Sequence, residues 1–321
     1  MNNLRDNKKI IDVVSVYRSV IILVIICLVS TLLSDKFLSL TNFFNVIRQV
    51  TVAGIIACGM TFVILTGGID LSVGSIVGFS GVVSAGTLAS TGNVFLSIAV
   101  ALVIGLACGA VNGILVAKFE IPAFIATLGM MILLRGCVLV YTNGKPIPAR
   151  NDVFNFIGKG DIFGVPFPII LLIIIYIIAY FILEKTIFGR NVYSIGGNRE
   201  ATALSGIDVV KNEFMVYVIN GLLSATAAVV LISRLGSAQS TSGEGIEMDA
   251  IAAVILGGTS LSGGTGYVLP TVIGAIIMGI IDNILTLLNV DPHATNIVKG
   301  AVILVAVLVD KKVKDLSEQA K

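Results

Sequence analysis

ILTGGIDLSVGSIVG, residues 64–78, interrupts one of the most apolar regions of a 321-residue chain with four glycines, several hydroxyls and an aspartate. The chain is 56% hydrophobic and only 12% charged, with a mean hydropathy of +1.02. A soluble domain of this length needs far more charge to cover its surface. The interruption therefore lies in a chain built for a lipid bilayer, where a polar break in an apolar run demands a reason.

Long runs without charge define the fold class. Residues 49–69, 162–183 and 214–233 contain no charged side chain, and each is about long enough to cross a hydrocarbon core of roughly 30 Å as a helix. Residues 71–117 are also free of charge and are long enough for two crossings. The alternating polarity of transmembrane strands is absent from these runs.

The sequence therefore predicts an all-α polytopic membrane protein with about ten transmembrane helices. Interrupted or half-helices are expected near 66–72 and 257–265, and residues 19–310 are expected to form a single transmembrane permease domain. The first apolar run ends without a small-residue cleavage site, so it is interpreted as an uncleaved helix. The predicted crossings are 19–34, 46–66, 72–90, 94–117, 121–142, 166–184, 213–233, 248–258 (too short to span alone), 266–288 and 294–310.

Basic residues near the helix ends predict the orientation. They gather in the N-terminal tail 1–18, the loop 185–212 and the C-terminal tail 311–321. The positive-inside rule places all three in the cytoplasm, and the even numbers of crossings between them agree. The loops 142–165 and 234–249 are then expected to face outward, although the first of them also carries some basic residues.

The break at Gly67-Gly68 frees backbone groups that lipid cannot satisfy, so it must face protein or a water-filled cavity. Asp70 carries the same implication, because an ionisable group in a membrane is costly unless it is paired or hydrated. Ser72 and Ser75 are expected to cap the helix that restarts after the break.

A second stretch, ILGGTSLSGGTGYVLP at residues 255–270, repeats the pattern of the first. Paired helix breaks indicate a transport site near the membrane midplane. Duplication and convergence both remain open, and so does the simpler explanation that glycines let helices pack closely. The crossing count puts both breaks on the same side. The residues assigned to the pathway and its breaks are Thr61, Thr66, Gly67, Gly68, Asp70, Ser72, Asn112, Gly257, Gly258 and Ser262, with Thr127, Asn220 and Asn283 as further polar groups in apolar surroundings.

The loop FGRNVYSIGGNREATALSGIDVVKNE, residues 188–213, contains a short helix signal. Gly196-Gly197 predicts a turn, Asn198 is a suitable N-cap, Glu200 suits the first turn, and Gly206 is expected to end the helix. About two turns of helix are not stable alone in water. The helix is therefore expected to pack on the membrane domain or to dock on a partner protein.

Several long motifs in this order resemble one known family. The chain is similar to the ribose-type permeases, the membrane subunits of bacterial sugar ABC importers, over nearly everything from about Asn42 to Asp310. The motifs are GMTFVILTGGIDLSVGS (59–75), FIATLGMMILLRG (124–136), VYTNG (140–144), GRNVYSIGGNREATALSGI (189–207), DAIAAVILGGTSLSGGTG (249–266) and AVILVAVLVD (301–310).

The resemblance implies a dimeric permease of about ten helices per chain in the bacterial cytoplasmic (inner) membrane. Its expected partners are a second permease chain, surrounding lipid, an extracytoplasmic sugar-binding protein and a cytoplasmic ATPase, which would hold the ATP and Mg²⁺. The resemblance implies ribose as the expected substrate, because the chain is most similar to the ribose-type permeases. In such families a coupling helix with a Glu-Ala-Ala-like pattern inserts into the ATPase, and Glu200-Ala201-Thr202-Ala203 matches it with Thr202 in place of the second alanine. The residues assigned to coupling are Gly197, Asn198, Arg199, Glu200, Ala201, Ala203, Ser205 and Gly206.

Other function classes lack the residues they need. No G-x-x-x-x-G-K-[ST] motif occurs, so the chain has no usual ATP-phosphate loop and no cofactor of its own is expected. His293 is the only histidine and the four cysteines have no metal spacing, so neither an enzyme nor a metal site is predicted. Nothing indicates a nucleic-acid partner. The alternative is an ion-coupled secondary transporter of a small polar solute, dependent on an acid such as Asp70 or Asp282.

The remaining charges receive surface roles. Arg135 and Lys299 are expected toward the outer ends of their helices, where they could snorkel to the interface. The acidic stretch 242–249 is expected to face outward. Its Glu244 and Glu247 are predicted to help seat a sugar-binding protein by charge complementarity.

Overall fold

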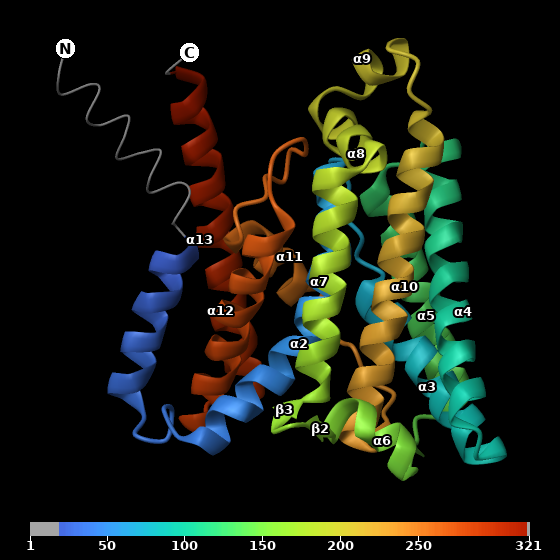
Figure 1. The fold of residues 1–321 in the computed structure, drawn as a ribbon, viewed down its shortest axis with the longest axis vertical. Helices are drawn as coiled ribbons and strands as arrows, with labels where there is room; N and C mark the ends of the chain where they lie inside the picture. Colours follow the sequence, from blue (N-terminus) through green and yellow to red (C-terminus); the bar gives the residue numbers. More distant parts are fainter. Residues whose placement is uncertain (1–18, 320–321) are drawn as a thin grey trace.

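A computed structural model of the chain describes residues 19–319, so the predicted tail 1–18 and the last two residues of the tail 311–321 lie outside the described residues. The described chain is a bundle of helices with a few two-residue strands at one end (Figure 1). Its elements are an apolar helix Ser19–Leu33, α2 (Leu40–Leu65), α3 (Val73–Thr91), α4 (Val94–Gly113), η1 (a π-helix, Ile114–Lys118), α5 (Ala123–Thr142), β1 (Ile147–Pro148), α6 (Asp152–Lys159), β2 (Asp161–Ile162), β3 (Val165–Pro166), α7 (Phe167–Lys185), α8 (Ile187–Gly197), α9 (Arg199–Leu204), α10 (Val209–Leu235), β4 (Ser237–Ala238), α11 (Ile246–Leu256), α12 (Val268–Leu287) and α13 (Pro292–Gln319).

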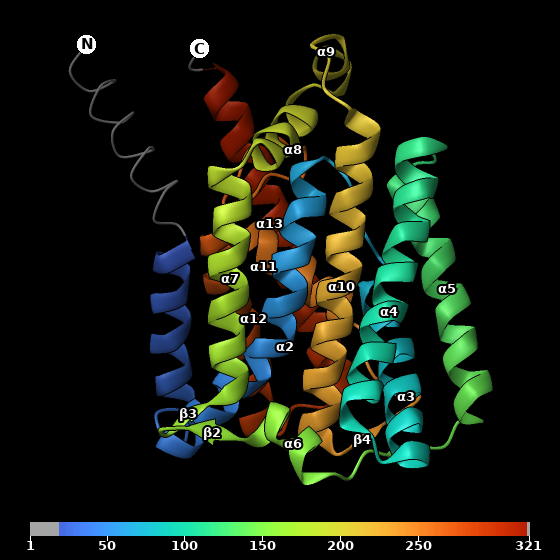
Figure 2. The ribbon, with the colours of Figure 1, turned by 45° about the vertical axis from the view of Figure 1, so that its right-hand side comes forward.

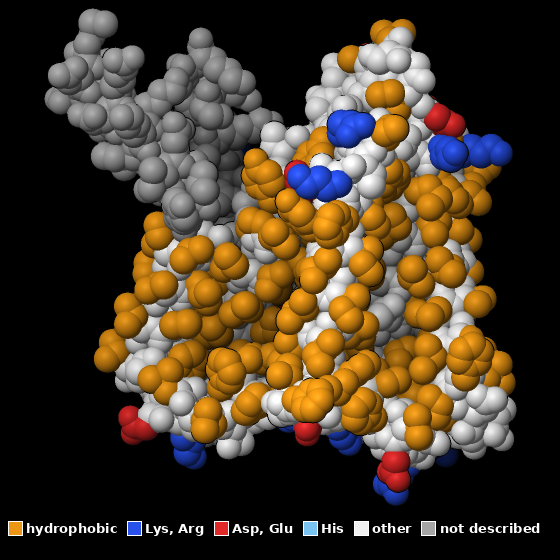
Figure 3. Space-filling view, viewed as in Figure 1, with side chains coloured by type: hydrophobic (Ala, Val, Ile, Leu, Met, Phe, Trp, Pro, Cys, Tyr) orange, Lys and Arg blue, Asp and Glu red, His pale blue; other side chains and the backbone are white. Residues whose placement is uncertain are grey.

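Seven helices among the described residues are long and apolar enough to cross a membrane: α2, α3, α4 continued by η1, α5, α7, α10 and α12. Two further apolar helices, Ser19–Leu33 and the Pro292–Leu308 part of α13, are shorter. Helix α11 has 11 residues, about 16 Å at 1.5 Å per residue, which is half a crossing, as expected for 248–258. The predicted class, a helical membrane protein, is confirmed. Seven of the predicted crossings have a helix long enough to span the membrane, so the count of about ten is not confirmed. A broad apolar surface separates charged groups at the two ends of the bundle (Figure 3).

Two of these helices begin earlier than the sequence predicts, because polar side chains cap them. The Ser39 hydroxyl accepts the Asn42 N–H at 3.3 Å, so α2 begins at Leu40 rather than at 46. The Asp208 carboxylate accepts the Lys211 N–H at 2.9 Å, so α10 begins at Val209 rather than at 213. Apolar runs mark the edge of the membrane, whereas caps mark the first free backbone amides.

The core lies between α2, α3, α10 and α12, in whose most apolar segments 61–78% of the residues are buried. In α4, α5 and α7 this share is only 22–28%, so these three helices form the outer layer. Helices α4 and α10 cross in direct contact, because a Cβ on Gly105 would meet the carbonyl oxygen of Gly221. Close packing therefore explains these two glycines, as small residues do at many membrane helix crossings.

The two predicted outer loops meet at the end of the bundle opposite α9 (Figure 2). Strand β1 from 142–165 pairs antiparallel with β4 from 234–249, with Ile147 opposite Ala238. The first segment also contains α6, which Asn151 caps by accepting the Phe154 N–H at 3.1 Å. This amphipathic helix was not predicted from the sequence, since its polar flanks resemble an ordinary loop.

The two glycine-rich breaks lie against each other. The Gly264 N–H donates to the carbonyl oxygen of Leu65 at 2.9 Å, and Gly67 and Gly258 both have positive φ angles, +82° and +96°. Both breaks contact Gly196 or its neighbour Gly197 in α8, so they share one end of the bundle, as the crossing count predicts. The glycine pairs themselves therefore lie at the α8 end rather than at the midplane.

The predicted turn at Gly196-Gly197 is wrong, because these residues are the last two of helix α8. The Thr186 hydroxyl accepts the Gly189 N–H at 3.2 Å and starts the helix at Ile187. A Cβ on Gly196 would meet the Leu65 carbonyl oxygen, so this glycine is required for close approach to the breaks rather than for a turn.

Candidate translocation and coupling site

Asp70 is the centre of a buried polar cluster between α2 and α3. One carboxylate oxygen accepts the Ser72 N–H at 2.9 Å and the Ser72 hydroxyl at 2.6 Å, and the other accepts the Asn220 amide of α10 at 2.9 Å. The Asn112 amide of α4 donates to the Ser72 hydroxyl at 2.8 Å. All four residues are fully buried. The cluster joins the first break to two helices and satisfies the carboxylate with hydrogen-bond donors.

The predicted capping roles of Ser72 and Ser75 are wrong. The Ser72 side chain makes no capping hydrogen bond to α3, and the Ser75 hydroxyl donates to the Ser72 carbonyl at 2.7 Å. Instead, the Asp70 carboxylate accepts the hydrogen bond of the Ser72 N–H. Aspartate side chains often accept in this way from the backbone two residues further on, which forms an Asx-turn. Asp70 thereby binds the restarting chain as well as α10.

Helix α5 fixes the break from another side. The Leu71 N–H donates to the Thr127 hydroxyl at 3.1 Å, and that hydroxyl donates to the Ala123 carbonyl at 2.8 Å. Tyr217 of α10 lies nearby: a Cβ on Gly68 would come within 2.6 Å of its phenol oxygen. Within the described residues, this buried phenol has no hydrogen-bond partner.

The other predicted pathway residues fall into separate contacts. The Thr61 hydroxyl lies 3.1 Å from that of Thr271, joining α2 to α12, and Asn283 and Asn42 exchange hydrogen bonds of 2.7 and 2.9 Å. Gly257 packs on α12, with a hypothetical Cβ only 2.7 Å from the Thr271 backbone. These residues hold helices together, while Gly258 and Ser262 belong to the second break. The structure does not bring them to the Asp70 cluster.

A polar cavity of about 320 Å³ opens between the first break and α9. The Thr66 hydroxyl donates back to the Val63 carbonyl at 2.8 Å, and Thr66 is one of the cavity's lining residues. The lining combines the break with acidic and basic groups from α9, α10 and the chain before α5. Beside Gly67 and Gly68, its polar side chains are Thr66, Glu120, Arg199, Glu213 and Tyr217.

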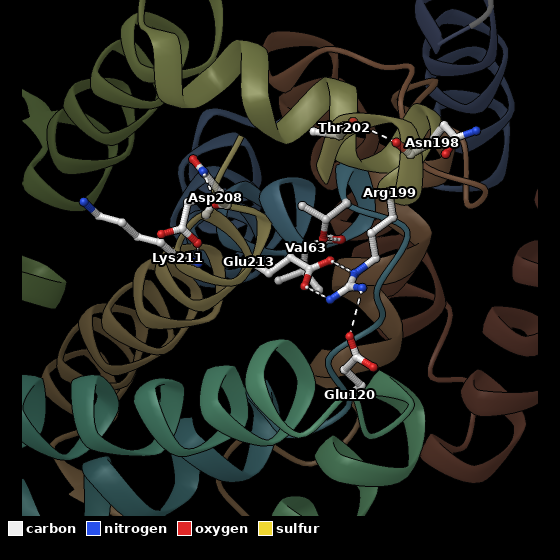
Figure 4. A network of polar contacts seen from close by, with 10 residues as sticks. Val63, Glu120, Asn198, Arg199, Thr202, Asp208, Lys211 and Glu213 are labelled. Atoms are coloured by element: carbon white, nitrogen blue, oxygen red, sulfur yellow. Dashed lines mark hydrogen bonds and ion pairs between the residues drawn. The ribbon is translucent and has the colours of Figure 1, made fainter. Parts of the chain in front are cut away.

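Arg199, the first residue of α9, lines this cavity and makes a fork of hydrogen bonds there (Figure 4). Its Nε donates to Glu213 Oε1 at 3.0 Å, its Nη2 donates to Glu213 Oε2 at 3.2 Å, and its Nη1 donates to Glu120 at 3.2 Å. The hydrogen bond to Glu213 is the main cause of a raised pKa for the Arg199 guanidinium. The ion pairs therefore tie α9 to α10 and to the connection between η1 and α5.

Helix α9 projects beyond the bundle from this anchored base (Figures 1 and 2). Asn198 accepts the Ala201 N–H at 2.9 Å, and Gly206, at φ +81°, follows the helix end, so the predicted cap and stop are confirmed. Leu204 is 90% exposed, whereas Thr202 is buried and donates to the Asn198 carbonyl at 2.7 Å. The departure from the Glu-Ala-Ala pattern thus lies on the inward side of α9.

Three members of this site were not singled out from the sequence: Glu120, Glu213 and Tyr217. Glu213 and Tyr217 share one face of α10 with Asn220, at the spacing of i, i+4 and i+7, so a helical projection of α10 is the signal that could have found them. Glu120 gave no such signal, because its position depends on the π-helix η1 and on its own left-handed backbone at φ +54°.

The acidic stretch 242–249 divides between surface and interior. Glu244 is exposed, as expected, but Glu247 is only partly exposed and its Oε2 lies where a Cβ on Gly74 would be. Arg135 does not extend freely to an interface: its Nη1 donates to the Ser242 carbonyl at 2.8 Å. The stretch therefore inserts against α3 and α5.

Lys299 also differs from its predicted role. Its ammonium lies 2.9 Å from Asp249 of α11 and 2.9 Å from Asp282 of α12, so it is held by two carboxylates and does not snorkel. His293 is exposed, and no group of histidine, cysteine, aspartate and glutamate suited to a metal occurs in the described part of the chain. The cysteines within 19–319 are all free thiols.

The apolar helical bundle is that of a polytopic membrane protein, and its two touching breaks, buried polar cluster and projecting short helix form the candidate site. The chain belongs to the family described as branched-chain amino acid transport system / permease component, whose model matches residues 42–307. It is a permease subunit of the ABC importer class and not itself an enzyme, because ATP hydrolysis in that class resides in a separate subunit.

Curated relatives cover nearly the whole chain. The ribose import permease protein RbsC of Escherichia coli K12 is 49% identical over 295 residues, covering 91% of this chain and 92% of that protein. RbsC of Bacillus subtilis 168 is 48% identical over 292 residues, covering 90% and 91%. The L-arabinose permease AraH of E. coli K12 is 36% identical over 295 residues, covering 92% and 90%. No solved structure matches the chain.

Proposed function

We propose that this chain is the membrane subunit of an ATP-driven ribose importer, in which it forms the translocation pathway and couples it to a separate ATPase. Relatives named as ribose permeases are 47–49% identical to it, whereas relatives named for L-arabinose reach 36–38%. Both substrates are pentoses, so the similarity supports a pentose and favours ribose.

Coupling through α9 rests on one observation: the base of α9 is held by the bundle while its tip is free. Arg199 pairs with Glu213 at the start of α10, and Asn220 two turns along α10 donates to Asp70. Leu204 at the tip is almost fully exposed, so an apolar contact surface is available to a partner. A force applied to α9 by an ATPase would therefore reach the first break through α10.

The orientation and partners follow from this assignment. The end that carries α9 and the C-terminal part of α13 would face the cytoplasm and the ATPase, which binds ATP and Mg²⁺ (Figure 1). The opposite end would receive sugar from an extracytoplasmic binding protein, with the exposed Glu244 as its docking carboxylate and Glu247 supporting from behind. A second copy of this chain would complete the permease within bacterial inner-membrane lipid.

The cavity beside Gly67 and Gly68 would be the cytoplasmic end of the pathway. Its polar lining suits a hydroxylated solute, and the presence of Arg199 in this lining would connect solute release to the position of α9. Asp70 would act as a buried pivot rather than as a solute ligand, because both of its carboxylate oxygens are already occupied by donors.

Uptake of labelled ribose into proteoliposomes tests the proposal, with this chain, its ATPase and its binding protein reconstituted together. Accumulation that requires ATP and both partners supports it. ATP turnover without ribose uptake would reject ribose as the substrate. Uptake by this chain alone, driven by an ion gradient, would reject the coupling assignment in favour of a secondary transporter.

A further inference from the structure

The short hairpin between α6 and α7 ends in a fully exposed aromatic ring. Strands β2 and β3 pair antiparallel with Ile162 opposite Val165, so Phe163 and Gly164 form the two-residue turn. The Phe163 side chain is fully exposed, and Ile162 and Val165 are exposed beside it. Residues opposite each other in an antiparallel pair have their side chains on one face, so these three side chains form one apolar patch at the tip.

The backbone of this turn does not explain the presence of a phenylalanine. Phe163 has a φ angle of +51° and Gly164 one of +78°, so both residues lie in the left-handed region. Hairpin turns of this kind favour Asn, Asp or Gly, because a side chain with a large Cβ substituent is unfavourable there. A phenylalanine in this conformation opposes the local preference, which indicates a use for the ring itself.

The hairpin lies at the level of the membrane surface. Helix α7 follows β3 directly, and its 19 residues span about 28 Å, close to the hydrocarbon thickness of roughly 30 Å. The first residue of α7, Phe167, therefore lies at the hydrocarbon boundary, and the hairpin lies just outside it. Figures 1 and 2 show the hairpin level with the ends of the long helices, and in Figure 2 it extends sideways past the foot of α7.

The patch continues a surface that α7 presents to lipid. Only 28% of the most apolar segment of α7 is buried, and Ile173, Ile174 and Ile177 are each about half exposed. In a membrane these side chains face acyl chains. Lys159 and Asp161, at the base of the hairpin, are exposed as well. A charged base and an aromatic tip suit the boundary between headgroups and acyl chains, where both kinds of side chain find a favourable environment.

Helix α6 attaches the hairpin to α10. The Ser233 hydroxyl of α10 accepts the Gly158 N–H at 2.7 Å and donates to the Phe154 carbonyl at 2.5 Å. At the other end of the hairpin, the Phe167 N–H donates to the Gly160 carbonyl at 2.9 Å. The exposed tip therefore has a base that is hydrogen-bonded to one of the core helices.

We propose that the β2–β3 hairpin is a membrane anchor, in which the Phe163 ring inserts between the headgroups and the upper acyl chains of the leaflet at the end opposite α9. Ile162 and Val165 lie at a similar depth, while Lys159 and Asp161 stay among the headgroups. The anchor links the end of α10 that carries Ser233 to the surface of the bilayer. It depends on neither the transported substrate nor the direction of transport.

Tryptophan fluorescence tests this anchor, because the chain contains no tryptophan of its own. The full chain is reconstituted into phosphatidylcholine nanodiscs whose acyl chains carry bromine, a quencher of indole, either close to the headgroup or near the chain ends. We expect bromine close to the headgroup to quench the Phe163→Trp variant several-fold more than bromine near the chain ends. Iodide in the surrounding water should quench this variant little.

Two variants calibrate the depth. Ile177→Trp, near the middle of α7 and half exposed, should respond more to bromine near the chain ends. Leu204→Trp, on the projecting helix α9, should respond to iodide and not to brominated lipid. Quenching of the Phe163→Trp variant by iodide alone would overturn the anchor and leave a protein partner as the explanation of the exposed ring. Quenching mainly by bromine near the chain ends would overturn the interfacial position.

A further variant tests whether the ring itself holds the hairpin in the lipid. Val165→Trp reports from the same hairpin with Phe163 intact, and bromine close to the headgroup should quench it. Adding Phe163→Asn should reduce this quenching several-fold, while the turn is kept, because asparagine tolerates the left-handed region. Adding Phe95→Asn, which removes an exposed ring at the start of α4, should leave the quenching unchanged. Equal quenching with and without Phe163→Asn would overturn the role of the ring.

Discussion

Arg199 and Glu213 meet through two parallel hydrogen bonds, Nε to Oε1 at 3.0 Å and Nη2 to Oε2 at 3.2 Å. Arg199 begins α9, which projects beyond the bundle end, and Glu213 belongs to the helix that reaches Asp70. The pair thus connects the projecting helix α9 to the helix that donates to the buried Asp70.

Arg199→Ala should uncouple transport from ATP hydrolysis more than it destabilises the permease. Arg199 is 42% exposed, so the pair should contribute about 1 kcal/mol or less to stability. We expect ribose uptake per ATP hydrolysed to fall several-fold. Arg199→Lys should recover only part of the loss, because an ammonium lacks the two-point fork. Arg190→Ala, an exposed arginine on α8, is the control; equal coupling in both variants would refute the connection.

Leu204→Asp should prevent productive contact with the ATPase, because it places a charge on the exposed apolar tip of α9. Glu200→Lys should have a similar but smaller effect, since it reverses the charge in the first turn of the same helix. The permease should remain folded and inserted in both cases. Stimulated ATPase activity and co-purification of the ATPase are the measurements, and normal values in either variant would remove that residue from the coupling surface.

Asp70→Asn should destabilise the permease by about 1–3 kcal/mol, because the new amide group faces donors where a carboxylate oxygen accepted them. Thermal unfolding of the purified permease in detergent measures the effect. Asp161→Asn, at an exposed position in β2, should change the unfolding temperature little. An unchanged unfolding temperature for Asp70→Asn would mean that the cluster is not a structural centre of the break.

Gly68→Ala should impair folding and uptake, because the new Cβ would lie 2.6 Å from the Tyr217 phenol oxygen. Tyr217→Phe removes that oxygen, so the double variant should recover much of the loss. In a double-mutant cycle, the double variant should therefore be more stable than the sum of the two single effects predicts. Additive effects of the two substitutions on the unfolding temperature would show that the two residues do not oppose each other in this way.

The sequence was informative where one physical rule dominates. Charge-free runs located five of the seven long apolar helices, namely α2, α3, α4, α7 and α10, because lipid excludes charge. Asn198 and Gly206 located α9, because caps act through neighbouring residues. It was uninformative where tertiary contacts decide. Gly196-Gly197 has the composition of a turn but ends α8, which packs on the breaks. No local pattern indicates that Lys299 meets Asp249 and Asp282 across three helices.

The candidate site was predictable in composition but not in grouping. Asp70, Ser72, Asn112 and Asn220 were all notable as polar residues in apolar runs, and the structure brings them together. Thr61 and Asn283 were notable for the same reason, yet they bond to Thr271 and Asn42 as contacts between helices. Polarity in a membrane helix indicates a buried partner, and only the packing decides whether that partner is another helix or the pathway.

The contact between Gly105 and Gly221 has a mechanical consequence. Because the two backbones approach each other closely at this crossing, a displacement of α10 would press directly on α4, and α4 presents exposed side chains such as Phe95 and Val103 to the surroundings. A movement of α10 would therefore also move the exposed apolar side chains of α4 through the hydrocarbon of the membrane. The thickness and stiffness of the membrane would then oppose this movement, so the lipid composition would affect the energy that the transport cycle requires.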